Sequence, residues 1–166
     1  IRRWVRSAEA SGGGIMAAAS WSSPLSALNR CLVEEAAAIV ASAHRLDGVQ
    51  VEAALTLLES CAAQGAKLVI TGVGKSGIVA RKIGATFTSI GLLAIYLNPL
   101  DARHGDLGVV APKDVVLLLS NSGETQELLE ILPHLRRRGT ARIALVGRID
   151  STPVSYTHLR AHETEA

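Results

Sequence analysis

Aromatic side chains are scarce in this sequence, at 3% of its 166 residues, although 48% of all residues are hydrophobic. A folded core must therefore consist mainly of Ala, Val, Leu and Ile, which are among the residues most often buried. The hydrophobic content also argues against disorder in the middle of the chain, because disordered segments have low hydrophobicity. The length suits a single domain, since domains commonly span about 100–200 residues.

A surplus of one charge sign, long apolar runs and closely spaced cysteines are also lacking. The 17 basic and 15 acidic residues leave a formal net charge of +2, too small for a strong field toward nucleic acid or an acidic membrane surface. No apolar run reaches the ~18 residues of a membrane span. Cys31 and Cys61 match no metal-ligand spacing, so we expect no metal site and two buried, reduced thiols in a cytoplasmic protein.

Short apolar runs alternate with helical patterns through the middle of the chain. Four runs predict buried strands, at 68–71, 93–97, 115–119 and 142–146. Apolar residues at helical spacing predict four helices, at 25–44, 49–63, 76–89 and 125–138. Continuous apolar strands separated by helices are typical of a parallel sheet covered on both faces. The predicted fold class is therefore α/β, a doubly wound parallel sheet flanked by helices.

The first candidate binding loop, 72–77, has the sequence GVGKSG and follows the first predicted strand. In open parallel sheets, ligands bind beyond the carboxyl ends of the strands. Gly74, Lys75 and Ser76 would lie at the start of a helix, where backbone N–H groups favour an anion. The loop also fits the G-x-G-x-x-G pattern of dinucleotide-binding domains, but that interpretation requires an acidic residue at the end of the next strand, and Asn98 stands there. In a purely structural interpretation, the glycines serve close packing and Lys75 is solvated.

The second candidate loop, 120–125, has the sequence SNSGET and also lies between a strand and a helix. It combines three hydroxyls, an amide and the backbone donors of a positive helix end, which suits a phosphate monoester. The residues expected to contact the phosphate are Ser120, Asn121, Ser122 and Thr125. The alternative is simple N-capping by Ser122, with Thr125 in the first turn of the helix.

Two further titratable residues accompany these loops. His104 lies in the polar segment 101–108, and its imidazole can change protonation near neutral pH, although a lone loop histidine is usually just solvated. Glu127 falls in the first turns of the helix that follows the second loop. Its carboxylate could face a ligand or simply complement the helix dipole, and spacing alone does not decide between the two.

At these residues the chain resembles the SIS (sugar isomerase) domain family, and specifically its arabinose-5-phosphate isomerases. The matching segments are GVGKSG at 72–77, ARHGDLG at 102–108 and SNSGET at 120–125, followed by Glu127. SNSGET alone is typical of the broader family, whereas HGDLG together with GKSG is much more specific to the isomerases. The resemblance runs from about residue 25 to Arg148.

The resemblance implies a flavodoxin-like sheet topology and a cytoplasmic enzyme without a cofactor. That enzyme interconverts D-ribulose 5-phosphate and D-arabinose 5-phosphate through an enediol, and it is a homo-oligomer, a tetramer in complete relatives. The resemblance also implies that Lys75, His104 and Glu127 are catalytic and that the Ser/Thr loop holds the phosphate. We expect Lys75 to stabilise negative charge, while Glu127 and His104 share ring opening and proton transfer.

The family pattern is not recognisable after Arg148, where the chain becomes polar. We therefore expect a disordered or non-native extension at 1–24, an incomplete SIS domain at 25–148 and a tail outside the family at 149–166. Activity of this exact chain is not implied. The main alternative function is a non-catalytic SIS-type module that binds a sugar phosphate for regulation.

Overall fold

The computed structural model describes residues 23–148 and 150–153, and the backbone of 159–162. The chain divides into two compact units, residues 1–40 and 41–166, which we treat separately. Residues 1–22 of the predicted extension at 1–24 and most of the predicted tail lie outside the described residues. No helix in the described part is long and apolar enough to cross a membrane.

Helix α2, Pro24–Ala43, lies mostly in the first unit. It begins at a proline, whose fixed φ and missing N–H suit the first position of a helix. The predicted helix is thus confirmed, but none of its residues is buried. Large apolar side chains at helical spacing, such as Leu28, Leu32 and Ile39, are exposed. Cys31 is exposed as well, against our expectation, whereas Cys61 in the second unit is buried as expected.

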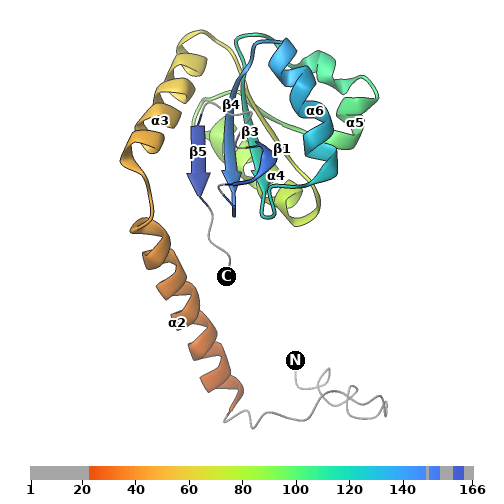
Figure 1. The fold of residues 1–166 in the computed structure, drawn as a ribbon. Helices are drawn as coiled ribbons and strands as arrows, with labels where there is room; N and C mark the ends of the chain where they lie inside the picture. The colour runs from red at the N-terminus through yellow and green to blue at the C-terminus, as the bar shows by residue number, and fades with distance from the viewer. Residues whose placement is uncertain (1–22, 149, 154–158, 163–166) are drawn as a thin grey trace, which may run out of the picture. The chain divides into compact units, whose positions relative to one another are not determined.

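The second unit is built on a parallel sheet in the order β2-β1-β3-β4-β5 (Figure 1). Its strands are β1 Leu68–Gly72, β2 Ala94–Leu97, β3 Val115–Ser120, β4 Ala141–Val146 and β5 Leu159–His162. This is the order of flavodoxin-like sheets, so the predicted doubly wound parallel fold is confirmed. The sequence pattern indicates only the first four strands, and β5 adds a fifth beside β4.

Helices cover both faces of this sheet. Their bounds are α3 Gly48–Ala63, α4 Gly74–Ser89, α5 Pro99–Arg103, the 3-10 helix η1 Asp106–Val109, and α6 Gln126–Arg137. One apolar cluster joins the sheet to α3 and α4, and the other joins it to α5, η1 and α6. Short polar side chains start some of these helices: Asp47 Oδ1 accepts the N–H of Val49 at the start of α3 over 2.9 Å.

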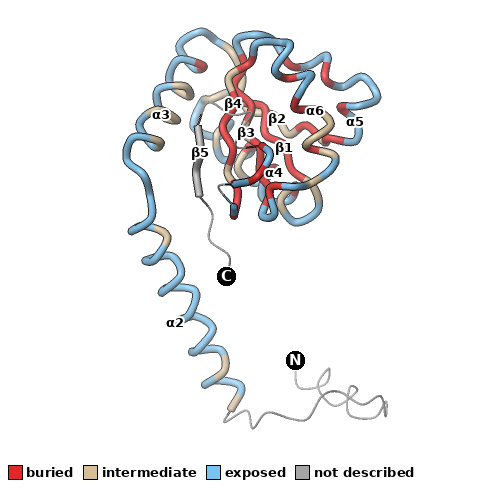
Figure 2. The backbone as a smooth tube through the Cα atoms, viewed as in Figure 1, coloured by how far each residue is buried: buried red, intermediate tan, exposed pale blue. Residues whose placement is uncertain are grey.

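Alternation along the strands divides the side chains between the two clusters. In β1, Leu68 and Ile70 pack toward α3 and α4, while Val69 packs toward α5 and α6. Strand β1 is buried along its whole length and β3 at every residue except the half-buried Leu117, and most of both strands is red in Figure 2. A strand buried on both faces must be apolar throughout, which explains the continuous apolar runs of the sequence.

The chain reverses its winding direction between β1 and β3. From β1 it passes through α4 to the neighbouring strand β2, and it then returns across the other face to β3. The segments that leave β1 and β3 therefore turn toward opposite faces at adjacent strand ends. In doubly wound sheets this switch point is where ligands bind.

Candidate functional site

The loop after β1 leads directly into the first turn of α4. Helix α4 begins at Gly74, two residues earlier than predicted, so Lys75 and Ser76 belong to the first turn. The N-cap residue is Val73, which has no side-chain acceptor to cap the helix. The first N–H groups of a helix lack intrahelical partners. Together with the exposed Lys75 ammonium, they make this helix start favourable for an anion.

Close backbone approach holds this loop in shape. A Cβ added to Gly77 would lie 2.8 Å from the carbonyl oxygen of Gly72 and 3.0 Å from the hydroxyl of Tyr96, so only glycine fits there. The Tyr96 hydroxyl donates a hydrogen bond to that same carbonyl over 2.9 Å. A groove of about 410 Å³ opens beside these residues. The guanidinium carbon of Arg81 in its wall lies 4.4 Å from the centre of the Tyr96 ring.

Hydrogen bonds within the loop after β3 fix its conformation. Ser120 is buried, its Oγ lies 2.8 Å from the Thr125 hydroxyl, and it accepts the N–H of Gly123 over 3.0 Å. Ser122 Oγ accepts the N–H of Glu124 over 3.2 Å. The N-cap of α6 is Thr125, without a side-chain cap hydrogen bond. The alternative that Ser122 caps this helix is therefore wrong, and the first turn of α6 keeps N–H donors for a ligand.

Asn121 and Ser122 are exposed, as is Glu124 in the same loop. The backbone carbonyl of Asn121 accepts the N–H of Gly147, at the end of β4, over 3.0 Å. This bond ties the loop to the next strand of the sheet. The side chains of Asn121 and Ser122 are exposed hydrogen-bond donors of this loop.

The two loops lie at the same edge of the sheet. Gly72 at the end of β1 pairs in register with Leu119 near the end of β3, and a Cβ on Gly72 would meet the Leu119 carbonyl at 3.1 Å. Two helix starts without side-chain caps thus stand at neighbouring strand ends, with Lys75 in one of them. This arrangement favours a small anionic ligand such as a phosphate monoester.

The other two candidate residues lie on the α5 and α6 side. Glu127 is half-buried in the first turn of α6, one residue beyond the start of the helix. His104 is the exposed C-cap of α5. Its neighbours Arg103 and Gly105 line a groove of about 660 Å³ with residues from the later turns of α6. Within the described part of one chain, no contact joins the His104 side chain to Lys75 or Glu127.

The end of β2 bears on the dinucleotide alternative. Asn98 follows β2, and its Oδ1 accepts the N–H of Leu100 over 3.2 Å, capping α5. A capping amide therefore occupies the position where a ribose-binding carboxylate is required.

Sequence reasoning gave no role to Glu124 in the second loop, although both its oxygens form hydrogen bonds in the structure.

Comparison with known proteins gives consistent matches. The SIS domain family model matches residues 62–165, more than half of the chain. Arabinose 5-phosphate isomerase KpsF of Escherichia coli O6:H1 (strain CFT073) is 37% identical over 128 residues, 77% of this chain and 38% of that protein. Arabinose 5-phosphate isomerase KdsD of Shigella flexneri is 45% identical over 86 residues, 52% of this chain and 26% of that protein.

Among solved structures, a protein of E. coli CFT073 in complex with arabinose 5-phosphate is 36% identical, with a TM-score of 0.70. The match covers 84% of this chain and 74% of that one. The chain spans less than two fifths of the length of the two curated isomerases it matches here.

Proposed function

Because this chain belongs to the SIS domain family, we propose that it carries the sugar-phosphate site of an isomerase that interconverts D-ribulose 5-phosphate and D-arabinose 5-phosphate. The similarity to arabinose 5-phosphate isomerases supports this proposal, as does the similarity to a structure in complex with arabinose 5-phosphate. The single observation that carries it is the pair of uncapped helix starts at the ends of β1 and β3, with Lys75 in one of them.

The phosphate group is assigned to the loop after β3. The exposed side chains of Asn121 and Ser122 and the first N–H groups of α6 would donate hydrogen bonds to its oxygens. The buried hydroxyl of Ser120 and its partner Thr125 bond to each other over 2.8 Å. They therefore contribute by holding the loop in the conformation that presents those donors.

The sugar end of the substrate is assigned to the helix start that follows β1. Isomerisation moves a proton between C1 and C2 through an enediol, and negative charge develops on oxygen. The Lys75 ammonium, beside the backbone N–H groups of Gly74 and Ser76, would stabilise that charge. Glu127 and His104 share ring opening and proton transfer in this proposal. Neither role needs an organic cofactor.

We also propose a homo-oligomer and a cytoplasmic location. The exposed apolar side chains of α2, such as Leu28, Leu32 and Ile39, support self-association. A long amphipathic helix gains stability mainly by burying its apolar face against another surface. Sedimentation velocity of the chain tests the oligomer: a monomer at all concentrations would contradict it.

A thermal-shift panel with three ligands tests the binding proposal. A ligand that binds only the folded protein raises its Tm, so we expect arabinose 5-phosphate to raise Tm more than glucosamine 6-phosphate, and NAD to have no effect. Lys75→Ala should weaken the shift, whereas Lys82→Ala, an exposed lysine later on α4, should not. A shift with NAD alone would favour a dinucleotide-binding domain.

Turnover separates the enzyme from the regulatory module. In the native full-length protein, Lys75→Ala should lower kcat for arabinose 5-phosphate by about 100-fold, because charge stabilisation of this kind commonly contributes that much. Binding of arabinose 5-phosphate without any turnover by the unmodified protein would favour the regulatory module. Undiminished turnover in Lys75→Ala would remove Lys75 from the mechanism.

A further inference from the structure

Glu124 is the only acidic residue of the SNSGET loop, and it stands directly before the N-cap of α6. A carboxylate beside a site for a phosphate weakens binding, because like charges repel and the ligand must be brought close to both. The direction in which the Glu124 side chain is held therefore affects how well the loop accepts an anion.

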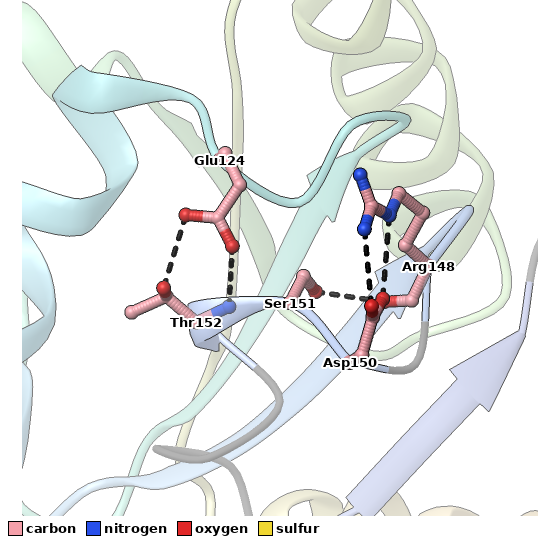
Figure 3. A network of polar contacts seen from close by, with 5 residues as sticks. All are labelled: Glu124, Arg148, Asp150, Ser151 and Thr152. Atoms are coloured by element: carbon pink, nitrogen blue, oxygen red, sulfur yellow. Dashed lines mark hydrogen bonds and ion pairs between the residues drawn. The ribbon is translucent and has the colours of Figure 1, made fainter.

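Both carboxylate oxygens of Glu124 are held by a single residue, Thr152. The backbone N–H of Thr152 donates to Oε1 over 2.7 Å, and its hydroxyl donates to Oε2 over 3.0 Å (Figure 3). Hydrogen bonds to an ionised carboxylate are stronger than those between neutral groups. Two bonds to two different oxygens also fix the orientation of the carboxylate, which one bond would leave free to rotate.

The position of Thr152 determines the side of the loop on which the Glu124 carboxylate is held. Thr152 follows β4, which pairs with β3 on the side opposite β1. Lys75 follows β1. The negative charge of Glu124 is therefore anchored on the β4 side of the second loop, whereas the positive charge of Lys75 stands on the β1 side.

The segment after β4 is packed against the loop at further points. Gly147 N donates to the Asn121 carbonyl over 3.0 Å. Within the segment itself, the Ser151 hydroxyl donates to the Arg148 carbonyl over 2.7 Å (Figure 3). Gly123 has a φ of +68°, and a Cβ placed on it would lie 2.3 Å from the Ser151 Cβ. The anchor for Glu124 is thus itself held in place.

We propose that Thr152 is a positioning residue for the second loop. Its N–H and hydroxyl draw the Glu124 carboxylate toward the segment after β4 and away from the start of α6, so that a phosphate can occupy the helix start without facing an unrestrained negative charge. The proposal rests on the proposed function, because it takes this loop as the phosphate site. It assigns no contact between Thr152 and the substrate.

Isothermal titration calorimetry of the whole chain, with arabinose 5-phosphate and separately with inorganic phosphate, tests this role. Thr152→Val removes the hydroxyl donor and keeps the shape, so Kd for both ligands should rise about threefold to tenfold. Thr152→Ser keeps the donor and should bind within about twofold of the unmodified chain. Thr86→Val serves as a control, because the Thr86 hydroxyl donates only to a carbonyl of its own helix.

Charge removal distinguishes positioning of the carboxylate from simple bracing of the loop. Glu124→Gln replaces the carboxylate with a neutral amide that does not repel a phosphate. Adding this substitution to Thr152→Val should therefore restore Kd to within about twofold of the unmodified chain. A Kd that stays weak in the double variant would overturn the proposal, because the loss would then come from loop distortion. Unchanged binding in Thr152→Val would overturn it as well. Circular dichroism melts confirm that each variant is folded.

The two ligands also separate this proposal from the proposed function. Binding of inorganic phosphate that responds to Thr152→Val, without binding of arabinose 5-phosphate, would support the positioning role and contradict the isomerase. Binding of neither ligand by the unmodified, folded chain would overturn both.

Discussion

At the edge of the sheet where the strands begin, Lys67 Nζ lies 2.6 Å from the carboxylate of Asp114, which is 2% exposed. At the edge where the strands end, Lys75 is exposed and forms no ion pair with any described residue. Asp114 also accepts the backbone N–H groups of Lys67 and Ala111, over 3.1 and 2.7 Å. Burial alone would raise the pKa of Asp114, but the hydrogen bond from the Lys67 ammonium and those from the two backbone N–H groups lower it below its ordinary value.

The contrast shows two uses of the same kinds of polar group. Around Asp114, three donors satisfy the buried carboxylate oxygens, which offsets the cost of burying the charge. At the starts of α4 and α6, side-chain caps are missing, so donors remain for a ligand at some cost in stability. We therefore expect substitutions at the first edge to change stability, and substitutions at the second to change binding.

The largest change in stability is expected from Asp114→Asn. The amide cannot replace the ionised acceptor of three hydrogen bonds, and Lys67 loses its partner, so the free energy of unfolding should fall by about 2–4 kcal/mol. Urea unfolding followed by circular dichroism measures it. Asp101→Asn, in an exposed position on α5, is the matched control. If Asp114→Asn lowered the free energy of unfolding by less than about 0.5 kcal/mol, the proposed difference between the two edges of the sheet would be contradicted.

The lowered pKa of Asp114 also predicts that the free energy of unfolding depends on pH. Because the pKa of Asp114 is lower in the folded than in the unfolded protein, its contribution is fully present above the unfolded-state pKa. It is lost as the pH falls through the folded-state pKa. Asp114→Asn should therefore flatten the acid side of the stability curve. An unchanged slope between neutral and acidic pH would contradict this assignment.

An intermediate effect is expected from Gly77→Ala, which acts on both stability and binding. The new Cβ meets backbone at 2.8 Å, so α4 must move away from β1, at a cost of about 1–3 kcal/mol. Because Lys75 lies in the same helix start, the affinity for arabinose 5-phosphate should fall as well. Gly48→Ala is the control, since a Cβ there meets nothing within 4 Å. Stability lost without any loss of affinity would separate this turn from the site.

The smallest change in stability is expected from Lys75→Met. The side chain is exposed, so the free energy of unfolding should change by less than about 0.5 kcal/mol. Calorimetric titration should nevertheless show weaker binding of arabinose 5-phosphate. A stability loss comparable to that of Asp114→Asn would mean that Lys75 has a structural role, and that both edges of the sheet contribute to stability in the same way.

Local patterns in the sequence predict much of the fold. The apolar runs at 68–71 and 115–119 became β1 and β3 with one residue added to each, because a strand covered on both faces needs apolar residues throughout. Helix boundaries were less accurate: α4 begins at Gly74 rather than Ser76. That shift moves Lys75 from a loop into a helical first turn, and no residue pattern marked it, since Val73 is an unusual N-cap.

Contacts between distant segments were not predictable in the same way. The hydrogen bonds from Thr152 to Glu124 join residues 28 positions apart, and Thr152 lies in a polar stretch without periodicity. The pairing of Ser120 with Thr125 is closer in sequence, yet it depends on how the loop turns after β3. The groove that Arg103 and Gly105 share with the later turns of α6 likewise follows from the path of α5.

By itself the sequence determined the strands β1 to β4, the helices α2, α3, α4 and α6, and the two polar loops that follow β1 and β3, because apolar periodicity and turn residues act over a few neighbouring positions. Only the tertiary structure decided which strands are neighbours, and so that the two loops follow adjacent strands and which side of the second loop holds the Glu124 charge. Strand order depends on crossovers that bury both faces of the sheet at once, and no local pattern encodes that choice.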